Sequence, residues 1–342
     1  MDELLNQSKE QLSIALIVGG ASSEREVSKL SSKSIYTALK KLGYRVTIID
    51  PALGLNQLSN DEEYFKPEVE KKLSTTNYPL AVQSLLDKNI DLAFLGLHGK
   101  WGEDGTIQSL FELCGIRYTG SGVLASALSM DKGKAKIIFK DNGVSVPKGL
   151  VISKNSYSLK DILLSVKMNY GFPIVIKPND EGSTMGLTIC TDESEIEKAL
   201  EFSFSYSNKT IIEEFIPGRE LTVGILDDKV LPVLEIKPKH ELYDFECKYT
   251  TGMSEYIVPA ELDEEISKSI QEQALKAYLS LGCRGYARAD FRLSPENKSY
   301  CLEVNTLPGM TSTSLLPKMA KANGISFEDL IKQIVDLSFK NG

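Results

Sequence analysis

The sequence lacks long apolar runs, long basic runs and paired cysteines, and each absence excludes a class of protein. No stretch approaches the roughly 18 consecutive apolar residues of a membrane-spanning helix, so we expect no membrane partner. Lysine and arginine number 39 against 47 for aspartate and glutamate, and the net charge of −8 argues against nucleic acid as a partner. The five cysteines are scattered without a Cys-x-x-Cys pair, which indicates reduced thiols and neither a disulfide framework nor a zinc site.

The rest of the composition is typical of a soluble globular protein. At 342 residues, of which 42% are hydrophobic and 25% charged, the chain has room for two or three domains and a substantial core. The first dozen residues are polar and do not resemble a secretory signal, so we expect a cytoplasmic enzyme.

The N-terminal third predicts an α/β fold with a parallel sheet. Residues 13–18 and 45–49 are apolar enough for strands, and apolar residues at helical spacing run between them from about Glu24 to Gly43. A strand–helix–strand order is a βαβ unit, whose strands lie parallel in one sheet. Further along this region we expect a buried strand over 90–97, a helix over 107–113 and an irregular surface excursion over 54–78.

The middle of the chain changes character near Met130. Here we expect a lysine-rich helix over 130–142, strands over 173–177, 187–189 and 211–215, and a helix over 193–202.

The last third holds the most informative pattern, two short strands over 286–292 and 300–305 that are joined by a polar turn. Because side chains alternate between the two faces of a strand, four polar side chains share one face: Arg288, Asp290, Glu303 and Asn305. The opposite positions are mostly apolar and suit a core: Ala289, Phe291, Leu302 and Val304. Carboxylate and amide oxygens suit Mg²⁺, which proteins usually hold with one or two carboxylates plus nucleotide phosphates. The alternative is an ion-paired hairpin that faces solvent.

The residues after this hairpin predict a helix start. Pro308-Gly309 interrupts the chain, the Thr/Ser cluster 311–314 can cap a helix through Leu315, and Asn323-Gly324 predicts its end. The unpaired N–H groups of a helix start can hold a carboxylate or phosphate. An ordinary loop-to-helix cap is the alternative.

Two glycine-containing turns follow strands in the N-terminal region, where ligands of α/β sheets usually bind. Gly19-Gly20 precedes Ser22–Ser28, but the pattern is not Gly-x-Gly-x-x-Gly, so a nicotinamide enzyme is disfavoured. A helix-capping sequence is the alternative for this motif. His98, one of two histidines, lies between strand and glycines at the second turn, although a lone histidine is more often structural.

The central region contributes candidate phosphate contacts. Lys177 ends a run of β-branched residues and needs an anionic partner or water nearby, whereas Lys132 alone would be a solvated helix lysine. The loop over 179–186 is rich in glycines and hydroxyls, and its backbone N–H groups could enclose phosphates. A plain hairpin loop is the alternative.

Arg-Ala-Asp at 288–290 and Glu-Val-Asn-Thr-Leu-Pro-Gly-Met-Thr-Ser at 303–312 resemble the D-alanine–D-alanine ligase family. The resemblance extends from Val18 to about Ile334, with the earlier motifs in order. It implies an α/β, ATP-grasp fold of three α/β domains: an N-terminal, Rossmann-like substrate domain with a parallel sheet, and two ATP-grasp subdomains with the nucleotide between them. We expect these domains over 1–127, 128–215 and 216–342.

The resemblance implies that ATP phosphorylates one D-alanine, and that a second D-alanine attacks the acyl phosphate to form D-alanyl-D-alanine for peptidoglycan synthesis. A ligase of the same fold that uses D-serine or D-lactate is the near alternative, and a nucleotide-binding regulator without catalysis is the distant one. The resemblance further implies a homodimer.

The resemblance also implies roles for matching residues. Those that orient or hold the first substrate are Glu24, Ser183, Tyr249 and His98. The second substrate's carboxylate is expected at the helix start, with Gly309, Ser314 and Leu315. Tyr249 and Lys248 lie in a polar segment that is expected to close over the site, and Tyr249 favours an amino acid as second substrate.

The nucleotide and its metals complete the set. Phosphate contacts are expected from Lys132 and Lys177, a nucleotide contact from Lys248, adenine contacts from Glu213 and the backbone of Phe215 and Ile216, and ribose contacts from Glu220. Without the resemblance, these glutamates could lie on an exposed edge strand. Two Mg²⁺ (or Mn²⁺) ions are expected on Asp290, Glu303 and Asn305, while Arg288 is expected to stabilise the developing oxyanion.

Overall fold

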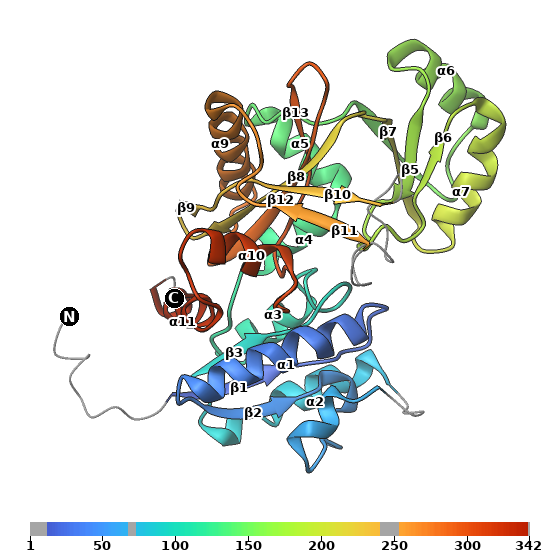
Figure 1. The fold of residues 1–342 in the computed structure, drawn as a ribbon. Helices are drawn as coiled ribbons and strands as arrows, with labels where there is room; N and C mark the ends of the chain where they lie inside the picture. Colours follow the sequence, from blue (N-terminus) through green and yellow to red (C-terminus); the bar gives the residue numbers. More distant parts are fainter. Residues whose placement is uncertain (1–11, 68–72, 240–252, 341–342) are drawn as a thin grey trace. The chain divides into compact units, whose positions relative to one another are not determined.

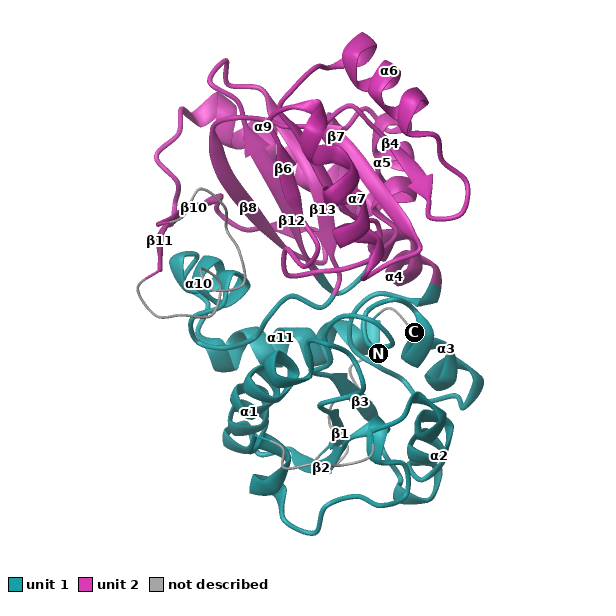
Figure 2. Cartoon of the chain, turned by 90° about the vertical axis from the view of Figure 1, so that its right-hand side faces the viewer, with its two compact units in different colours: residues 1–123, 284–286, 307–342 teal, residues 124–283, 287–306 magenta. Residues whose placement is uncertain are grey.

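A computed structural model describes residues 12–67, 73–239 and 253–340 of the chain (Figure 1). These residues form two compact units (Figure 2). Unit 1 comprises residues 1–123, 284–286 and 307–342, and unit 2 comprises residues 124–283 and 287–306. The division into three domains stays a prediction. In the described part of the chain, no helix combines the length and apolar character needed to cross a bilayer.

Unit 1 is built on a three-stranded sheet of order β2-β1-β3, formed by β1 (Ser13–Ile17), β2 (Arg45–Ile49) and β3 (Leu92–Leu95). All three strands are parallel, which confirms the βαβ prediction. The crossover helix is α1 (Arg25–Lys41), which packs against the last helix of the chain, α11 (Phe327–Lys340). The remaining helices of the unit are α2 (Tyr78–Gln83), α3 (Thr106–Leu113) and α10 (Leu315–Ala322).

The region over 54–78 is largely the expected surface excursion, because most of its described residues are exposed or half-buried. It contains two short 3₁₀ helices, η2 (Asp61–Phe65) and η3 (Thr75–Asn77), and Tyr64 is buried in a cluster with Val18 and Ile48. The prediction missed the burial of Tyr64, because this aromatic side chain reaches a distant apolar surface that local composition does not reveal.

Unit 2 contains two antiparallel sheets. The four-stranded sheet has the order β4-β7-β5-β6, with β4 (Gly149–Ser153), β7 (Lys209–Glu214), β5 (Ile174–Pro178) and β6 (Thr188–Cys190). Helices α6 (Leu159–Asn169) and α7 (Ile196–Phe204) pack on it through a shared apolar cluster and lie beside it in Figure 1.

The six-stranded sheet of unit 2 has the order β11-β10-β8-β12-β13, with β9 paired to β8. Its strands are β8 (Arg219–Leu226), β9 (Lys229–Val230), β10 (Leu234–Pro238), β11 (Ser254–Ile257), β12 (Tyr286–Leu293) and β13 (Ser299–Asn305). Helices α5 (Lys132–Asp141) and α9 (Glu264–Ser280) contribute to one apolar cluster with this sheet. The β12–β13 pair confirms the predicted hairpin.

The helix expected over 130–142 begins later than its lysine pattern indicated. Met130 ends a separate helix, α4 (Val123–Met130), which the sequence pattern did not reveal. Asp131 is the N-cap of α5, because its side chain accepts a hydrogen bond from the Lys134 N–H at 3.0 Å.

Strict alternation also fails at one position in the hairpin. The register shifts after the Asp290–Glu303 pair, so that Phe291 lies opposite Cys301 and Leu302 is the extra residue of a β-bulge. Cys301 is therefore fully buried, whereas the expected core residue Leu302 is half-buried.

Candidate active site

The β12–β13 pair places the four predicted polar side chains on one face of the six-stranded sheet. In the register, Arg288 lies opposite Asn305 and Asp290 lies opposite Glu303. All four residues are half-buried, while Ala289 and Val304 on the other face are buried. The convergence predicted from strand alternation is therefore confirmed.

Every carboxylate on this face has a hydrogen-bonding or cationic partner. The Arg288 guanidinium donates to both Asp290 oxygens, Nε to Oδ1 at 2.8 Å and Nη2 to Oδ2 at 2.7 Å. The Thr222 hydroxyl of β8 also donates to Asp290 Oδ1 at 2.6 Å. Across the hairpin, Lys132 Nζ lies 3.0 Å from Glu303 Oε2. These residues form a charged cluster, and its geometry is fixed by the bidentate Arg288–Asp290 pair and by the hydrogen bond from Thr222.

The donor chemistry of this face fits Mg²⁺ that is shared with a polyphosphate. Two carboxylates and an amide supply only hard oxygen ligands, and Mg²⁺ typically takes one or two carboxylates and completes its shell with phosphates and water. Among the described residues, no group of three or more His, Cys, Asp and Glu side chains forms an all-protein metal cage. The residues present therefore fit Mg²⁺ bound together with a nucleotide.

A buried Lys–Glu–Lys cluster lies in the same unit. Glu213, on the interior strand β7, pairs with Lys136 of α5 through Oε2 and with Lys177 of β5 through Oε1 at 2.6 Å. Burial would raise the pKa of Glu213, but the two lysine charges outweigh it and lower that pKa to about 2. Burial lowers the pKa of Lys136 to about 8 against the opposing effect of Glu213.

This cluster tests two statements made from the sequence, one about Lys177 and one about Glu213. Lys177 does have the anionic partner that its position required, and Glu213 is not on an exposed edge strand. Lys136 was missed, although its spacing of four from Lys132 places both lysines on one face of α5.

The loop between β5 and β6 is tied to the start of α5. Lys132 Nζ donates to the Glu181 carbonyl at 2.7 Å, and the Gly133 N–H donates to the buried Asn179 side chain at 2.9 Å. Lys132 is thus buried, in contrast to the solvated helix lysine that its local sequence indicated. Ser183 and Thr184 have left-handed backbones, with φ of 52° and 63°. Strained residues of this kind often cluster in ligand-binding loops.

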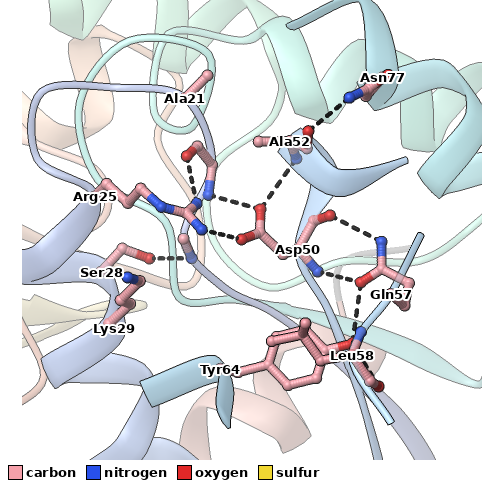
Figure 3. A network of polar contacts seen from close by, with 12 residues as sticks. Ala21, Arg25, Ser28, Lys29, Asp50, Ala52, Gln57, Leu58, Tyr64 and Asn77 are labelled. Carbon is pink, nitrogen blue, oxygen red and sulfur yellow. Dashed lines mark hydrogen bonds and ion pairs between the residues drawn. The ribbon is translucent and has the colours of Figure 1, made fainter. Parts of the chain in front are cut away.

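In unit 1, a buried ion pair shapes the turn after β1 (Figure 3). Arg25 and Asp50 point toward one another, and Asp50 Oδ1 also accepts from the Gly20 N–H at 3.1 Å. Arg25 Nη1 donates to the Gly20 carbonyl at 2.6 Å, so both the N–H and the carbonyl of Gly20 are hydrogen-bonded to this ion pair. Gly19 must lack a side chain, because its φ is 75° and a Cβ would lie 2.4 Å from Arg25 Nη1.

This turn places Glu24 beside the second glycine-containing turn, which follows β3 and includes His98 and Gly99. Glu24 is the N-cap residue of α1, but its side chain makes no capping hydrogen bond. Its Oε2 lies where a Cβ on Gly99 would come within 2.7 Å, so the carboxylate rests against the His98-Gly99 backbone. Ser22 links the same two turns, because its hydroxyl donates to the His98 carbonyl at 2.7 Å.

Both ring nitrogens of the buried His98 lie within hydrogen-bonding distance of protein oxygens. Nδ1 lies 2.9 Å from the Leu307 carbonyl, which can only accept, so we assign the proton to Nδ1. Nε2 lies 2.9 Å from the Ser31 hydroxyl, which accepts in turn from the Met310 N–H at 3.2 Å. His98 thus joins the turn after β3 to the segment that leads into α10, and its contact with the first substrate stays a prediction.

The start of α10 brings the predicted residues Gly309, Ser314 and Leu315 together. Leu315 is the first residue of the helix and Ser314 is its N-cap, without a side-chain capping bond. The Ser314 hydroxyl instead accepts from the Thr311 N–H at 3.0 Å, and a Cβ on Gly309 would lie 2.9 Å from that hydroxyl. The expected cap is therefore a turn within the Thr/Ser cluster, and Asn323 ends the helix as predicted.

The predicted residues fall into two groups. Unit 1 holds Glu24, His98, Gly309, Ser314 and Leu315, and unit 2 holds Lys132, Lys177, Ser183, Glu213, Phe215, Ile216, Glu220, Arg288, Asp290, Glu303 and Asn305. Lys248 and Tyr249 lie outside the described residues. Sequence reasoning missed Arg25, Asp50, Ser31 and Thr222, whose roles depend on partners distant in the chain.

Comparison with known proteins agrees with this geometry. Two family profiles match, "D-ala D-ala ligase N-terminus" over residues 13–121 and "D-ala D-ala ligase C-terminus" over residues 138–336. The D-alanine–D-alanine ligase of Halalkalibacterium halodurans is 42% identical over 334 residues, which cover 96% of this chain and 100% of that protein. That of Syntrophotalea carbinolica is 41% identical over 329 residues, or 96% of this chain and 97% of that protein.

Solved structures show the same likeness. The D-alanine–D-alanine ligase from Bacillus anthracis complexed with ATP has a TM-score of 0.77 at 33% identity, covering 96% of this chain and 98% of that chain. The VanG D-Ala:D-Ser ligase from Enterococcus faecalis has a TM-score of 0.80 at 30% identity, covering 96% of this chain and 100% of that chain.

Proposed function

Because the chain belongs to the D-alanine–D-alanine ligase family, we propose that it joins two D-alanines at the expense of ATP and releases ADP and phosphate. The fold is the α/β ATP-grasp fold that the resemblance implied, as the likeness to ligase structures shows. The observation that carries the proposal is the β12–β13 register, which pairs Asp290 with Glu303 and Arg288 with Asn305 on one face.

In the proposed reaction, a carboxylate oxygen of the first D-alanine attacks the γ-phosphorus of ATP, and ADP leaves. The amine of the second D-alanine, after losing a proton, attacks the acyl carbon, and the tetrahedral intermediate expels inorganic phosphate. Glu24 orients the first substrate, and Arg288 donates to the oxygen on which negative charge develops. The N–H groups at the start of α10, near Ser314 and Leu315, receive the second carboxylate.

The nucleotide part of the proposal concerns unit 2. Lys132 and Lys177 contact phosphates, Glu213 and the backbone of Phe215 and Ile216 contact the base, and Glu220 contacts the ribose. Asp290, Glu303 and Asn305 would hold two Mg²⁺ ions. When bound with ATP, these ions would neutralise charge on the transferred phosphoryl group.

The remaining predicted residues have roles in binding the first substrate and the nucleotide. Ser183 joins Glu24 and Tyr249 in orienting the first substrate, with His98 against its carboxylate, and Lys248 contacts the nucleotide. A role in peptidoglycan precursor synthesis, a cytoplasmic location and a homodimer are proposed from family membership.

The test is phosphate release from ATP and Mg²⁺ with D-alanine, and in parallel with L-alanine, D-serine and D-lactate, followed by mass analysis of the products. We expect phosphate and D-alanyl-D-alanine, with L-alanine inert. Phosphate release that requires D-serine or D-lactate as acceptor would instead indicate a ligase that joins D-alanine to that acceptor. The likeness to the D-Ala:D-Ser ligase is the reason to include D-serine. ATP binding without phosphate release under any of these conditions would refute the proposed activity.

A further inference from the structure

Arg292 holds a short segment between the two sheets of unit 2. It lies on the same face of β12 as Arg288 and Asp290, in a half-buried position. Its Nε donates to the Ile216 carbonyl at 3.1 Å and its Nη2 to the Gly218 carbonyl at 2.9 Å. Its Nη1 lies 3.5 Å from Glu220 Oε2. All three partners belong to residues 216–220, where β7 has ended and β8 begins.

This segment depends on outside contacts for its conformation. Residues 215–218 lie between β7 and β8, and Pro217 has no N–H to donate. Gly218 has a φ of 112° and a Cβ there would lie 2.1 Å from the Leu293 carbonyl, so the backbone is seated directly against the end of β12. The Phe215 ring lies 5.8 Å from the Arg292 Cζ, which adds a cation–π contact.

Arginine is suited to this position because its planar guanidinium carries five N–H donors in a fixed fork. It can therefore hold two carbonyls and one carboxylate at the same time. Lysine, with a single ammonium on a flexible chain, cannot match the same three directions.

We propose that Arg292 is a positioning residue for the nucleotide, which fixes the Ile216 backbone for the base and the Glu220 carboxylate for the ribose. This inference rests on the proposed function, because it takes ATP as the ligand of residues 213–220. Arg292 acts through the segment and need not touch ATP. A purely structural role would instead stabilise unit 2 without affecting which nucleotide is preferred.

The test compares Arg292→Met with Arg284→Met in the full-length chain. Arg284 is a matched control, because it is also half-buried, its Nε donates to the Gly120 carbonyl at 3.3 Å, and its Cζ lies 5.4 Å from the centroid of the Tyr118 ring. It belongs to unit 1, which holds none of the proposed nucleotide contacts. We measure KM for ATP, KM for D-alanine, ADP affinity by calorimetry, and the preference for ATP over 2′-deoxyATP and 3′-deoxyATP.

For Arg292→Met we expect KM for ATP to rise about tenfold, the size of one lost charge-assisted hydrogen bond. ADP affinity should fall in parallel, the preference for an intact ribose should narrow, and KM for D-alanine should stay unchanged. Arg284→Met should match the wild-type protein in all four measurements. Arg292→Lys should lie between the wild-type protein and Arg292→Met, and it replaces Arg292→Met if that variant does not fold.

The contrary results are distinct. An Arg292 variant with wild-type ADP affinity and ribose preference overturns the inference and leaves the proposed function intact. An equal effect on both substrates, together with a lowered Tm, assigns Arg292 a structural role and also overturns it. If the wild-type protein binds neither ATP nor ADP, the proposed function falls and the inference falls with it.

Discussion

At the scale of single residues, hydrogen-bond donors fix the orientation of the carboxylates on β12 and β13. Arg288, Thr222 and Lys132 each direct a hydrogen-bond donor to Asp290 or Glu303. These partners hold the carboxylates in a fixed orientation, which suits the metal binding proposed for them.

Asp290→Asn and Glu303→Gln should therefore reduce turnover by roughly 10³-fold or more while the chain stays folded. Each change keeps the shape of the side chain and removes only the negative charge that the proposed metal ions require. Phosphate release and circular dichroism would be measured together. Glu197→Gln, an exposed carboxylate on α7, serves as the control. A folded Asp290→Asn protein with near-normal turnover would remove the metal assignment.

Backbone strain at Thr184 gives a second residue-scale prediction. Thr184 is β-branched with φ of 63°, and this left-handed conformation costs a non-glycine residue about 1–2 kcal/mol. After allowing for the greater freedom of glycine in the unfolded chain, Thr184→Gly should raise the free energy of unfolding by up to about 1 kcal/mol. The measurement is the urea midpoint at unchanged slope. Thr184→Ala retains a Cβ and should bring no such gain.

At the scale of elements, helix α5 and strands β5 and β7 are joined by one buried charge cluster. Lys136, Lys177 and Glu213 come from these three elements, and all three side chains are largely removed from solvent. A buried carboxylate between two lysines is stable only while both signs are present. Replacing the carboxylate should therefore affect stability differently from replacing one of the lysines.

Glu213→Gln should destabilise the protein by about 3–5 kcal/mol, because two buried lysines would then face each other without an anion. Lys136→Met should cost less, because Glu213 keeps its 2.6 Å contact with Lys177 and the remaining pair is neutral overall. Urea unfolding at neutral pH gives both values. A larger loss for Lys136→Met than for Glu213→Gln would contradict this account of the cluster.

At the scale of the whole molecule, unit 1 is assembled from both ends of the chain. Ser31 and Met310 are 279 positions apart in sequence and are joined by a hydrogen bond. His98 bonds to Leu307 over a separation of 209 positions. His98, which is proposed for the first substrate, is therefore connected within unit 1 to the segment that leads into α10, where the second substrate is proposed to bind.

Alkaline pH should weaken both units through their tyrosines. Burial raises the pKa of Tyr64 and Tyr78 in unit 1, and of Tyr170 in unit 2, from 10.0 to about 12. Between pH 10 and 12 the native tyrosines keep protons that the unfolded chain has lost. The free energy of unfolding should therefore be unaffected by these groups below pH 10 and fall as the pH rises through this window.

Urea unfolding at pH 9, 10 and 11, with tyrosinate absorbance followed in parallel, would measure this effect. Tyr78→Phe keeps the buried ring and removes the ionisable hydroxyl, so part of the alkaline loss should disappear in that variant. Constant stability across these values of pH would contradict the proposed cause.

The sequence by itself determined several of the elements and the faces of the two hairpin strands. The parallel βαβ unit, the β12–β13 hairpin and the shared face of Arg288, Asp290, Glu303 and Asn305 all follow from local periodicity, because strand and helix geometry repeat every few residues. The motifs at Glu24 and at 303–312 also carried the family, which the comparisons then showed. The bulge at Leu302 and the burial of Tyr64 were not visible there, because both depend on what packs against them.

Only the tertiary structure decided the partners of the charged side chains. Lys136, Arg25, Asp50 and Arg292 received no role from the sequence, yet each is paired with a specific group elsewhere in the chain. A charge is stable in a poorly solvated place only when another charge or a set of carbonyls meets it there. Such pairs form only when the tertiary structure brings distant parts of the chain together, and local sequence patterns extend over too few residues to reveal them.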